Sequence, residues 1–457
     1  MNNIHDALIV GSGLSGLAIS HFLEKKRPDM KIVLLEKASR PGGAIQTFRE
    51  DGFQAEWGPH GFLDNIPESR ELLQDTGLDQ EAQKAPLNDF LRFLCHNGKL
   101  IPLPQNPKKI LTTPLIPFWG KLRILADLWT KPVMEDQTVG QWAVRRFGKS
   151  VHPLVDAAVT GTFSGDLDRL SIDSVMPGLR ALEKESGSVL RSLKKKNKKS
   201  AGIKTGLPSM ISFPQGMEKL IEVLAKGKPI RFNTGVQKIE KQNNIWEVRT
   251  DNTTFRTRAL ILALPVNQAL ELLSPLNKPP VKKIPVSKII NVALGFSGNA
   301  VIPRGFGYLA PEKENRFTLG AMFSTHMFPG RAPEGRILLE GLVGGRRHPE
   351  RLELEDENIL REVYNDLSLL MELPEPPLFS RVLRSTDGIP QLEMDHPALM
   401  EWLKKLVRKM EGLYISGFGW NGIGMNDMIK SAKKTARTVA EGGYGKSETA
   451  AVKGVYF

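Results

Sequence analysis

The sequence predicts an α/β protein built on a doubly wound, mostly parallel sheet with further lobes inserted into it. The chain opens with an apolar strand over Ala7–Val10, a glycine-rich turn over Gly11–Gly16, a helix over Leu17–Lys25 and a second apolar run over Lys31–Leu35. Near the other end, an apolar strand over Leu413–Ser416 again precedes a glycine-rich turn and a helix. Strands so far apart in sequence can share one sheet and bind one dinucleotide between them.

Length and composition limit the class of protein. The 457 residues suffice for about three domains at roughly 150 residues each. Hydrophobic residues make up 40% and glycines number 42, which excludes collagen, coiled coil and wholesale disorder. The single cysteine, Cys95, excludes an internal disulfide framework and any cysteine-based zinc or iron–sulfur site. It is consistent with a reducing compartment.

The net charge of +13 comes mostly from two windows. Residues 99–131 hold six basic side chains and one acid, and residues 180–205 hold nine basic and two acidic ones. We therefore expect a local basic surface, with Lys194–Lys199 in a solvated loop. No module for nucleic-acid recognition accompanies this charge, so no nucleic-acid partner is expected. No apolar run approaches the ~18 residues of a membrane span.

The remaining elements follow from periodicity and from glycine and proline breaks. The pattern predicts helices over 138–195, 354–372, 397–410 and Asn426–Val439, and strands over 229–265 and 285–345. The charged residues and helix breakers over 194–208 predict a loop. The predicted domains are a discontinuous dinucleotide-binding domain (1–80, 205–270 and 385–445), a helical basic lobe (81–204), a substrate lobe (271–384) and a tail (446–457).

The first turn, Gly11-Ser12-Gly13-Leu14-Ser15-Gly16, is a G-x-G-x-x-G motif between a strand and a helix. Gly11 permits the tight turn, Gly13 leaves room for a pyrophosphate, and Gly16 lets helix and strand pack closely. The helix N-terminus offers free N–H groups to the phosphates. Glu36, 20 residues after Gly16, can accept hydrogen bonds from ribose hydroxyls. The motif therefore predicts a dinucleotide site.

Further motifs resemble a large flavoprotein family. Glu36-Lys37 leads to Arg40-Pro41-Gly42-Gly43-Ala44, where Arg40 can meet phosphate, and then to the segment Glu56–Gly61. This pattern resembles the amine oxidases, phytoene desaturases and protoporphyrinogen oxidases, which implies FAD. The last turn, Gly417–Gly424, opens a helix whose N-terminus would stabilise the anionic reduced flavin.

Several middle segments resemble one branch of that family, the oxygen-using, FAD-dependent porphyrinogen oxidases. They are Arg92–Leu94, Thr138–Gly148, Gly161–Asp166, Phe213–Met217, Ile389–His396 and Gly422–Ala432. The resemblance implies a Rossmann-like FAD-binding domain, discontinuous in sequence, with an α+β substrate lobe and a helical membrane-contacting lobe. It also implies oxidation of protoporphyrinogen IX to protoporphyrin IX in haem synthesis, with molecular oxygen reduced to peroxide.

The resemblance assigns roles by position. No side chain is expected to be catalytic, because the flavin N5 accepts the hydride, and no metal site is expected. Arg92 would pair a propionate of the tetrapyrrole, and the other predicted substrate-binding residues are Gly161, Phe306, Leu309 and Leu342. The predicted cofactor-binding residues are Gly11, Ser12, Gly13, Leu14, Ser15, Gly16, Glu36, Lys37, Arg40, Gly43, Ala44, Gly58, Pro59, His60, Gly61, Val236, Phe418, Ile423, Gly424 and Met425.

The segment Phe118–Thr130 is similar to the family's membrane-contacting region. Its apolar side chains fit one broad helical face, with lysines nearby, which suits an interface with anionic lipid. The alternative is a helix that covers the pocket by packing alone. We expect a cytoplasmic protein, peripheral on the inner membrane, with hand-over of product to a ferrochelatase as an implied partnership. The sequence leaves open whether the protein forms a homodimer.

Two positions depart from the family pattern: Asp395 stands where glycine is frequent, and Asn421 where an acid is frequent. The alternatives left open are the same oxidation of coproporphyrinogen III, a flavin amine oxidase or desaturase, and a non-catalytic FAD- and porphyrin-binding protein. Porphyrin formation from either reduced substrate separates the two porphyrinogen oxidations from the amine oxidase or desaturase and from the binding protein.

Overall fold

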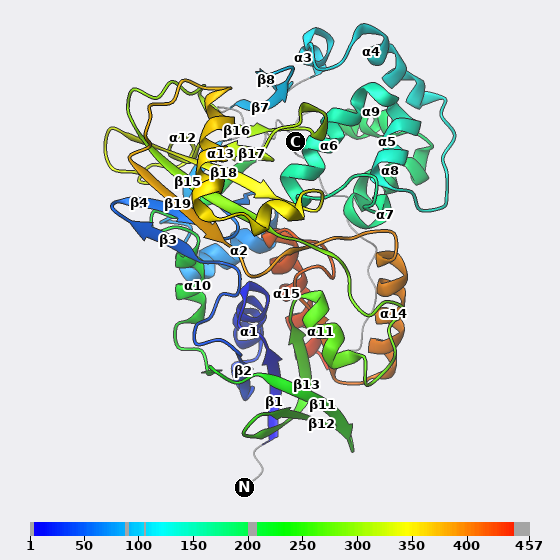
Figure 1. Ribbon diagram of the computed structural model, residues 1–457. Helices are drawn as coiled ribbons and strands as arrows, with labels where there is room; N and C mark the ends of the chain where they lie inside the picture. The colour runs from blue at the N-terminus through cyan, green and yellow to red at the C-terminus, as the bar shows by residue number, and fades with distance from the viewer. Residues whose placement is uncertain (1–3, 87–90, 105–106, 200–207, 443–457) are drawn as a thin grey trace.

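The computed structural model describes residues 4–86, 91–104, 107–199 and 208–442. Figure 1 shows a lower lobe built on a parallel sheet, an upper sheet on one side and a cluster of helices on the other. The α/β class and the discontinuous nucleotide-binding domain are confirmed, because strands from three separate segments of the chain form the lower sheet. The predicted domain boundaries remain a prediction.

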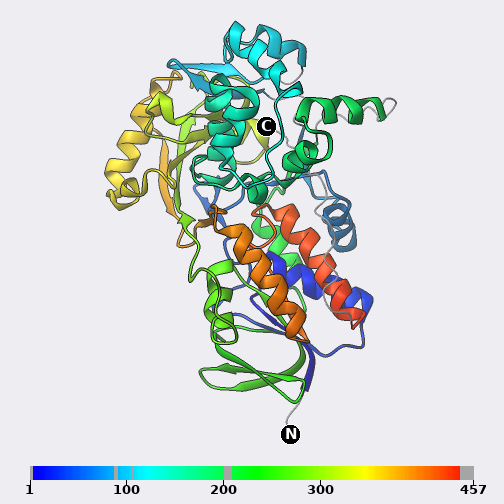
Figure 2. The same ribbon diagram turned by 90° about the vertical axis from the view of Figure 1, so that its right-hand side faces the viewer.

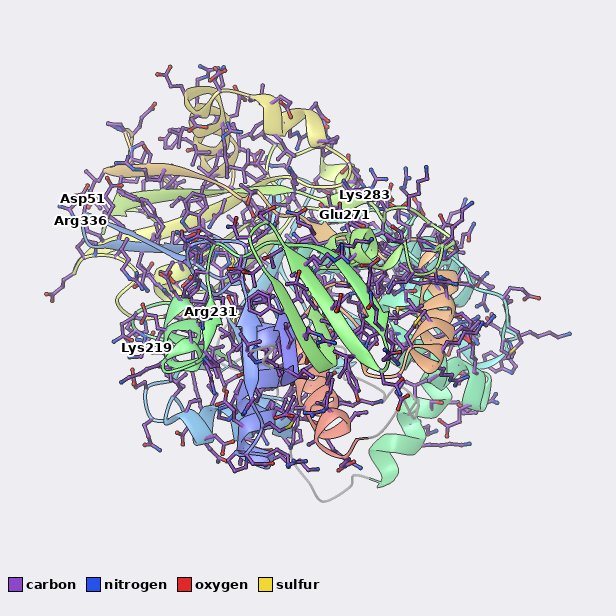
Figure 3. All side chains as sticks on the ribbon, turned by 90° about the horizontal axis from the view of Figure 1, so that it is seen from below. Asp51, Lys219, Arg231, Glu271, Lys283 and Arg336 are labelled. Atoms are coloured by element: carbon purple, nitrogen blue, oxygen red, sulfur yellow. The ribbon has the colours of Figure 1, made fainter. Side chains whose placement is uncertain are left out.

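The lower sheet has seven strands in the order β10-β2-β1-β13-β12-β11, with β21 paired to the end of β13. β1, β2, β10, β13 and β21 run parallel, and β11, β12 and β13 form an antiparallel meander. The parallel strands are nearly continuous apolar runs because helices cover both faces. Arg231, labelled in Figure 3, lies at the edge strand beside β2. The strands are β1 (Ile4–Val10), β2 (Ile32–Leu35), β10 (Ile230–Arg231), β11 (Val236–Gln242), β12 (Ile245–Thr250), β13 (Thr254–Ala263) and β21 (Leu413–Ser416).

Close packing of glycines joins β1 to the helix that follows, α1 (Leu14–Lys26). A Cβ atom on Gly16 would lie 2.0 Å from the carbonyl oxygen of Gly11, and Gly11 itself has a φ of +97°. Only glycine at both positions allows this turn. Helix α15 (Met425–Ala440) lies against α1 on one face of the sheet (Figure 2, red and dark blue), whereas the buried apolar residues of α14 belong to the core on the other face. The other helices of this lobe are α2 (Pro67–Thr76), α10 (Glu218–Ala225), α11 (Val266–Leu273) and α14 (His396–Lys409).

The upper sheet also has seven strands, in the order β19-β15-β18-β17-β16-β7-β8. Helix α13 (Asp356–Ser368) covers one face, where Ile359 and Val363 pack against Val292 and Leu339. The other face points toward the lower lobe and α6. The strands are β7 (Leu91–His96), β8 (Lys99–Pro102), β15 (Ile289–Ser297), β16 (Gly305–Leu309), β17 (Gly320–Met322), β18 (Arg336–Gly344) and β19 (Phe379–Arg384).

Short elements connect the two sheets. β3 pairs with β4, β5 and β6 flank β9, and β14 pairs with β20. Their bounds are β3 (Thr47–Glu50), β4 (Phe53–Glu56), β5 (Phe62–Leu63), β6 (Gln83–Pro86), β9 (Ser209–Ser212), β14 (Val286–Ser287), β20 (Ile389–Pro390) and α12 (Ser324–Met327), with 3-10 turns η3 (Glu312–Glu314) and η4 (Pro349–Glu353).

A buried ionic cluster holds the helical lobe together. Glu183 accepts hydrogen bonds from Trp142 (2.6 Å), Arg180 (2.7 Å) and Arg145 (2.8 Å). Burial alone would raise the pKa of Glu183, but these donors lower it to about 2. The helices are α3 (Pro107–Thr112), α4 (Phe118–Leu125), α5 (Val139–Phe147), α6 (His152–Phe163), α7 (Ile172–Val175), α8 (Pro177–Ser186) and α9 (Val189–Lys199), with 3-10 turns η1 (Ala126–Leu128) and η2 (Lys149–Val151).

The structure corrects three predictions. Residues 194–199 lie in helix α9 and not in a loop, because lysine is a good helix former and continues the helix that begins at Val189. Residues 200–207 lie outside the described residues. The segment 81–204 is not wholly helical, since it supplies β6, β7 and β8. The predicted helix over Phe118–Thr130 divides into α4 and the 3-10 turn η1.

The glycine turn yields a matched pair of variants. Gly16→Ala places a methyl group against the Gly11 carbonyl, so we expect the free energy of unfolding to fall by about 1–3 kcal/mol. Gly13→Ala is the control, because Gly13 has a φ of −69° and a Cβ there meets no atom within 4 Å. Denaturant unfolding of both variants measures the difference. Equal destabilisation by the two substitutions would contradict this account of the turn.

Candidate functional site

The turn between β1 and α1 is an open phosphate cradle. No side chain caps the N-terminus of α1, so the backbone N–H groups at Leu14 and Ser15 have no partner within the helix. The open space at the Cβ position of Gly13 lets a ligand approach the backbone closely. These features fit a pyrophosphate at a helix N-terminus. The three glycines therefore have different roles: Gly11 and Gly16 pack closely against the backbone, whereas the Cβ position of Gly13 is open to a ligand.

Glu36 stands at the end of β2, where its buried carboxylate is partly satisfied by the protein. One oxygen, Oε2, accepts hydrogen bonds from the Ser12 amide and the Ser12 hydroxyl, both at 2.8 Å. The other, Oε1, accepts one from the Ala38 amide at 2.9 Å. A carboxylate has about four acceptor positions, so room remains for a ribose hydroxyl. Ser12 therefore orients Glu36, a role that the motif alone did not indicate.

The paired glycines lie against the first turn. Gly42 donates to the Ser12 carbonyl at 2.9 Å, and Gly13 and Gly42 form a parallel bridge. Gly43 has a φ of +58°, which favours glycine. The Arg40 guanidinium donates to three carbonyls of its own loop, at Pro41, Gly43 and Ile45. It therefore fixes the loop, while its expected contact with phosphate stays a prediction.

The predicted adenine segment lies beside the end of β2. The Thr234 amide donates to the Glu36 carbonyl at 2.8 Å, and the Asn233 amide to the Ala38 carbonyl at 3.1 Å. These bonds place Val236, at the start of β11, close to Glu36. Lys37 is exposed at this edge. The structure thus brings Lys37, Glu36 and Val236 to one edge of the sheet, and their contact with the cofactor stays a prediction.

The segment Gly58–Gly61 continues the same line of contacts toward the upper sheet. A Cβ on Gly58 would lie 2.3 Å from the Ala44 carbonyl oxygen, and one on Gly61 would lie 2.5 Å from the Ile211 carbonyl oxygen. The backbone on either side of Pro59 and His60 is therefore pressed between the Gly-Gly loop and β9. An elongated cofactor that starts at Gly13 can follow this line to the second sheet.

The last glycine turn meets the first at the end of β13. A Cβ on Gly417 would lie 2.3 Å from the Leu264 carbonyl oxygen, and one on Gly11 would lie 2.8 Å from the Ala263 carbonyl oxygen. Phe418 accepts a hydrogen bond from the Val266 amide at 3.0 Å, which fixes the turn. Ile423 and Gly424 lead into α15, whose first residue, Met425, is buried against the α1 core. Met425 is thus placed by packing.

The predicted substrate residues lie on one face of the upper sheet, the face that α13 leaves uncovered. On β7 and β16, Phe93 and Tyr308 point to the α13 side, so their neighbours Arg92 and Leu309 point away from it. A Cβ on Gly161 of α6 would lie 2.7 Å from the Leu309 side chain, so these two residues are in contact. Together with Leu342 they form one wall.

Phe306 occupies the same face but a different cluster. It packs with Ala85, Met327 and Phe328, with Met322 against them, and it does not share a cluster with Leu309. A register shift between Gly305 and Gly307 separates the two side chains along β16. The structure therefore does not by itself place them as two sides of one sandwich, and that role stays a prediction.

Arg92 is half-buried, and burial lowers the pKa of its guanidinium. Among the residues that the structure describes, no acid acts in the opposite direction, and the buried Nε has no hydrogen-bond partner. An unpartnered donor in an apolar wall costs free energy unless a ligand accepts from it. The position suits a carboxylate on an otherwise apolar ligand.

A buried polar network lies on the same face of the upper sheet as this wall, and of its members only His60 was predicted as a site residue. His60 contacts Glu340 on β18 at 2.9 Å, and Asn291 on β15 donates to the same carboxylate at 2.5 Å. Nearby, Arg331 pairs with Glu56 at 3.0 Å. The signal in the sequence is Glu340 itself, a lone acid within the apolar strand Ile337–Val343. Such an acid is rarely buried without partners.

An exposed group of large apolar side chains lies on α4 and η1. Trp119 is 76% exposed and Trp129 is 78% exposed, whereas the interpretation of this segment as a packed cover predicts burial. Arg146, fully buried, pairs with Asp127 at 2.9 Å and anchors the segment to α5. No helix among the described residues is long and apolar enough to span a bilayer. We call this group the aromatic patch: Phe118, Trp119, Leu122, Leu125 and Trp129.

Comparison with known proteins agrees with this geometry. The family model for flavin-containing amine oxidoreductases matches residues 14–440. The chain is 27% identical to coproporphyrinogen III oxidase of Bacillus subtilis, over 93% of this chain and 96% of that relative. It is 27% identical to chloroplastic protoporphyrinogen oxidase 1 of Arabidopsis thaliana, over 94% and 87%.

Solved structures support the fold. A crystal structure from Exiguobacterium sp. 255-15 covers 96% of this chain and 100% of its own, with a TM-score of 0.79 and 22% identity. Reduced UDP-galactopyranose mutase superimposes with a TM-score of 0.72 over 96% of both chains, at 15% identity. The match to the family model over nearly the whole chain, together with the phosphate cradle, leads to one conclusion: this protein belongs to the flavin-containing amine oxidoreductase family and takes FAD as its cofactor.

Proposed function

We propose that the protein oxidises protoporphyrinogen IX to protoporphyrin IX. The observation that carries the proposal is the half-buried guanidinium of Arg92 in the apolar wall of Leu309 and Leu342, whose Nε has no partner within the part of the chain that the structure describes. A tetrapyrrole with few carboxylates and apolar vinyl groups suits such a wall. The relatives named for porphyrinogen oxidation cover nearly the whole chain and support the same substrate class.

The residues have defined tasks in this proposal. Arg92 binds a propionate and sets the orientation of the ring, and Gly161 leaves space beside Leu309 for its edge. The apolar wall excludes water from the reacting carbon. FAD, when bound, supplies two-electron oxidation, and three such oxidations convert porphyrinogen to porphyrin while three O2 become three H2O2. The protein contributes binding and orientation.

Coproporphyrinogen III is the second candidate, favoured by the names of the Bacillus and Staphylococcus relatives. It carries four propionates, which need more cationic partners than Arg92 supplies. We expect FAD-loaded protein in air to form porphyrin faster from protoporphyrinogen IX, measured as initial rates of fluorescence increase. The opposite preference would select coproporphyrinogen III. No fluorescence with either substrate would contradict both and leave an amine oxidase, a desaturase or a binding protein.

Arg92 provides a second prediction. Loss of a charge-assisted hydrogen bond in Arg92→Ala is expected to lower kcat/KM for the porphyrinogen roughly 10- to 100-fold, mainly through KM, with Arg92→Lys intermediate. Arg381→Ala is the control, because that exposed arginine pairs with Glu50 on the surface. Steady-state kinetics at several substrate concentrations measures the effect. An unchanged KM in Arg92→Ala would remove this residue from the substrate site.

We also propose that the aromatic patch rests on the cytoplasmic face of the inner membrane. Exposed tryptophans beside basic residues suit an interface with anionic lipid. The double variant Trp119→Ser/Trp129→Ser is expected to weaken partition onto anionic vesicles roughly tenfold or more in a flotation assay. The control Leu369→Ser/Leu378→Ser removes two exposed leucines elsewhere and is expected to bind as the wild type does. Equal binding of all three proteins to the vesicles would show that the aromatic patch does not contact the membrane.

A further inference from the structure

His60 lies where the cofactor segment meets the substrate wall. Backbone contacts run from Gly13 through the bridge to Gly42, then from Ala44 to Gly58. Two residues later the His60 side chain reaches across to β18 of the upper sheet. FAD whose pyrophosphate binds at Gly13 would extend its flavin end along this line toward His60.

The partner of His60 is Glu340, which is 1% exposed. Glu340 and Leu342 are two residues apart on β18, so both side chains point to the substrate face. Glu340 also accepts hydrogen bonds from the Ser324 hydroxyl and the Asn291 amide, each at 2.5 Å. These donors come from α12 and β15. The carboxylate is thus held rigidly from three sides.

Charge balance assigns a proton to His60. Two buried acids, Glu56 on β4 and Glu340 on β18, face one permanent cation, Arg331, which pairs with Glu56. Among the residues that the structure describes, His60 is the only ion-pair partner of Glu340. A buried carboxylate without a cation is costly. The imidazolium form of His60 removes that cost.

The pKa shifts of His60 and Glu340 both favour the charged form of each group, in agreement with this charge balance. Burial lowers the pKa of His60, but the Glu340 charge and hydrogen bond, with a smaller contribution from Glu56, raise it overall, while Arg331 opposes them. Burial raises the pKa of Glu340, but His60, Ser324 and Asn291 lower it to about 2. His60 is therefore positive below its raised pKa and loses its charge as the pH rises through it.

The second ring nitrogen of His60 remains available. The Nε2 atom faces Glu340, and within the described part of the chain no hydrogen bond involves Nδ1. The side chain is 14% exposed, so a ligand in the site can reach it. In the imidazolium form Nδ1 carries a hydrogen and donates.

We propose that His60 is a positioning residue that Glu340 holds beside the flavin end of FAD, where its ring presents a positive charge and an Nδ1–H donor that favour the anionic, reduced cofactor. The inference rests on FAD as the cofactor and not on the identity of the substrate. A positive charge stabilises a nearby anion more than a neutral ring, so reduced FAD should bind more tightly relative to oxidised FAD.

The test is equilibrium redox titration of bound FAD in the wild type, His60→Gln and the neutral double variant His60→Gln/Glu340→Gln. We expect both variants to bind reduced relative to oxidised FAD about tenfold less tightly, which lowers a two-electron midpoint potential by about 30 mV. The double variant leaves no unpaired buried charge, so it remains informative if His60→Gln folds poorly. His21→Gln removes a similar histidine–carboxylate pair, with Asp75, on the outside of α1 and is expected to leave the potential unchanged.

A second readout needs no turnover and no substrate. NMR titration of the His60 ring in FAD-loaded protein should give a pKa above the ordinary value of about 6.5, and Glu340→Gln should lower it. In the wild type, the potential should fall relative to that of the double variant as the pH rises through that pKa, because Glu340 then keeps its negative charge without a cation beside it. A His60 pKa at or below 6.5, or equal potentials in the wild type and the double variant, would overturn the proposal whether or not porphyrinogen is the substrate.

Discussion

The structure depends on the close approach of backbone at the carboxyl ends of β1 and β13. Gly11 and Gly16 permit contacts that no side chain would allow, and Gly417 repeats the arrangement on the next strand. Because these strands are parallel, both glycine turns emerge at the same edge of the sheet. The N-termini of α1 and α15 therefore converge on one region. The site for an elongated dinucleotide is a direct consequence of this packing.

The second requirement is a firm connection between the two sheets. Glu56 with Arg331, and His60 with Glu340, cross that boundary in buried ion pairs. Such pairs contribute little net stability, but loss of one partner is costly, so they fix one relative position of the lobes. The face of β7, β16 and β18 that α13 leaves uncovered is thereby held against the segment that contains Gly58–Gly61.

Much of the fold could be predicted from local patterns. The strand Leu413–Ser416 agrees with β21 in both bounds, and the first strand–turn–helix unit is where the motif indicated. Local patterns failed where long-range packing decides. The strands β7 and β8 join a sheet whose other strands lie about two hundred residues or more later in the chain. Likewise, the role of Glu340 could not be predicted from its own strand, because it depends on contacts with His60 and Asn291, which are distant in sequence. The lysine run was mispredicted for a local reason, since it continues helix α9.

The most direct test of the account is an anaerobic half-reaction. FAD-loaded protein would be mixed with protoporphyrinogen IX in the absence of oxygen, and the absorbance of oxidised flavin followed together with porphyrin fluorescence. The account predicts that the flavin band bleaches as porphyrin precursors are oxidised, and that it returns when oxygen is admitted. Flavin that stays oxidised in the presence of porphyrinogen would contradict the proposed reaction, even if the protein binds the porphyrin.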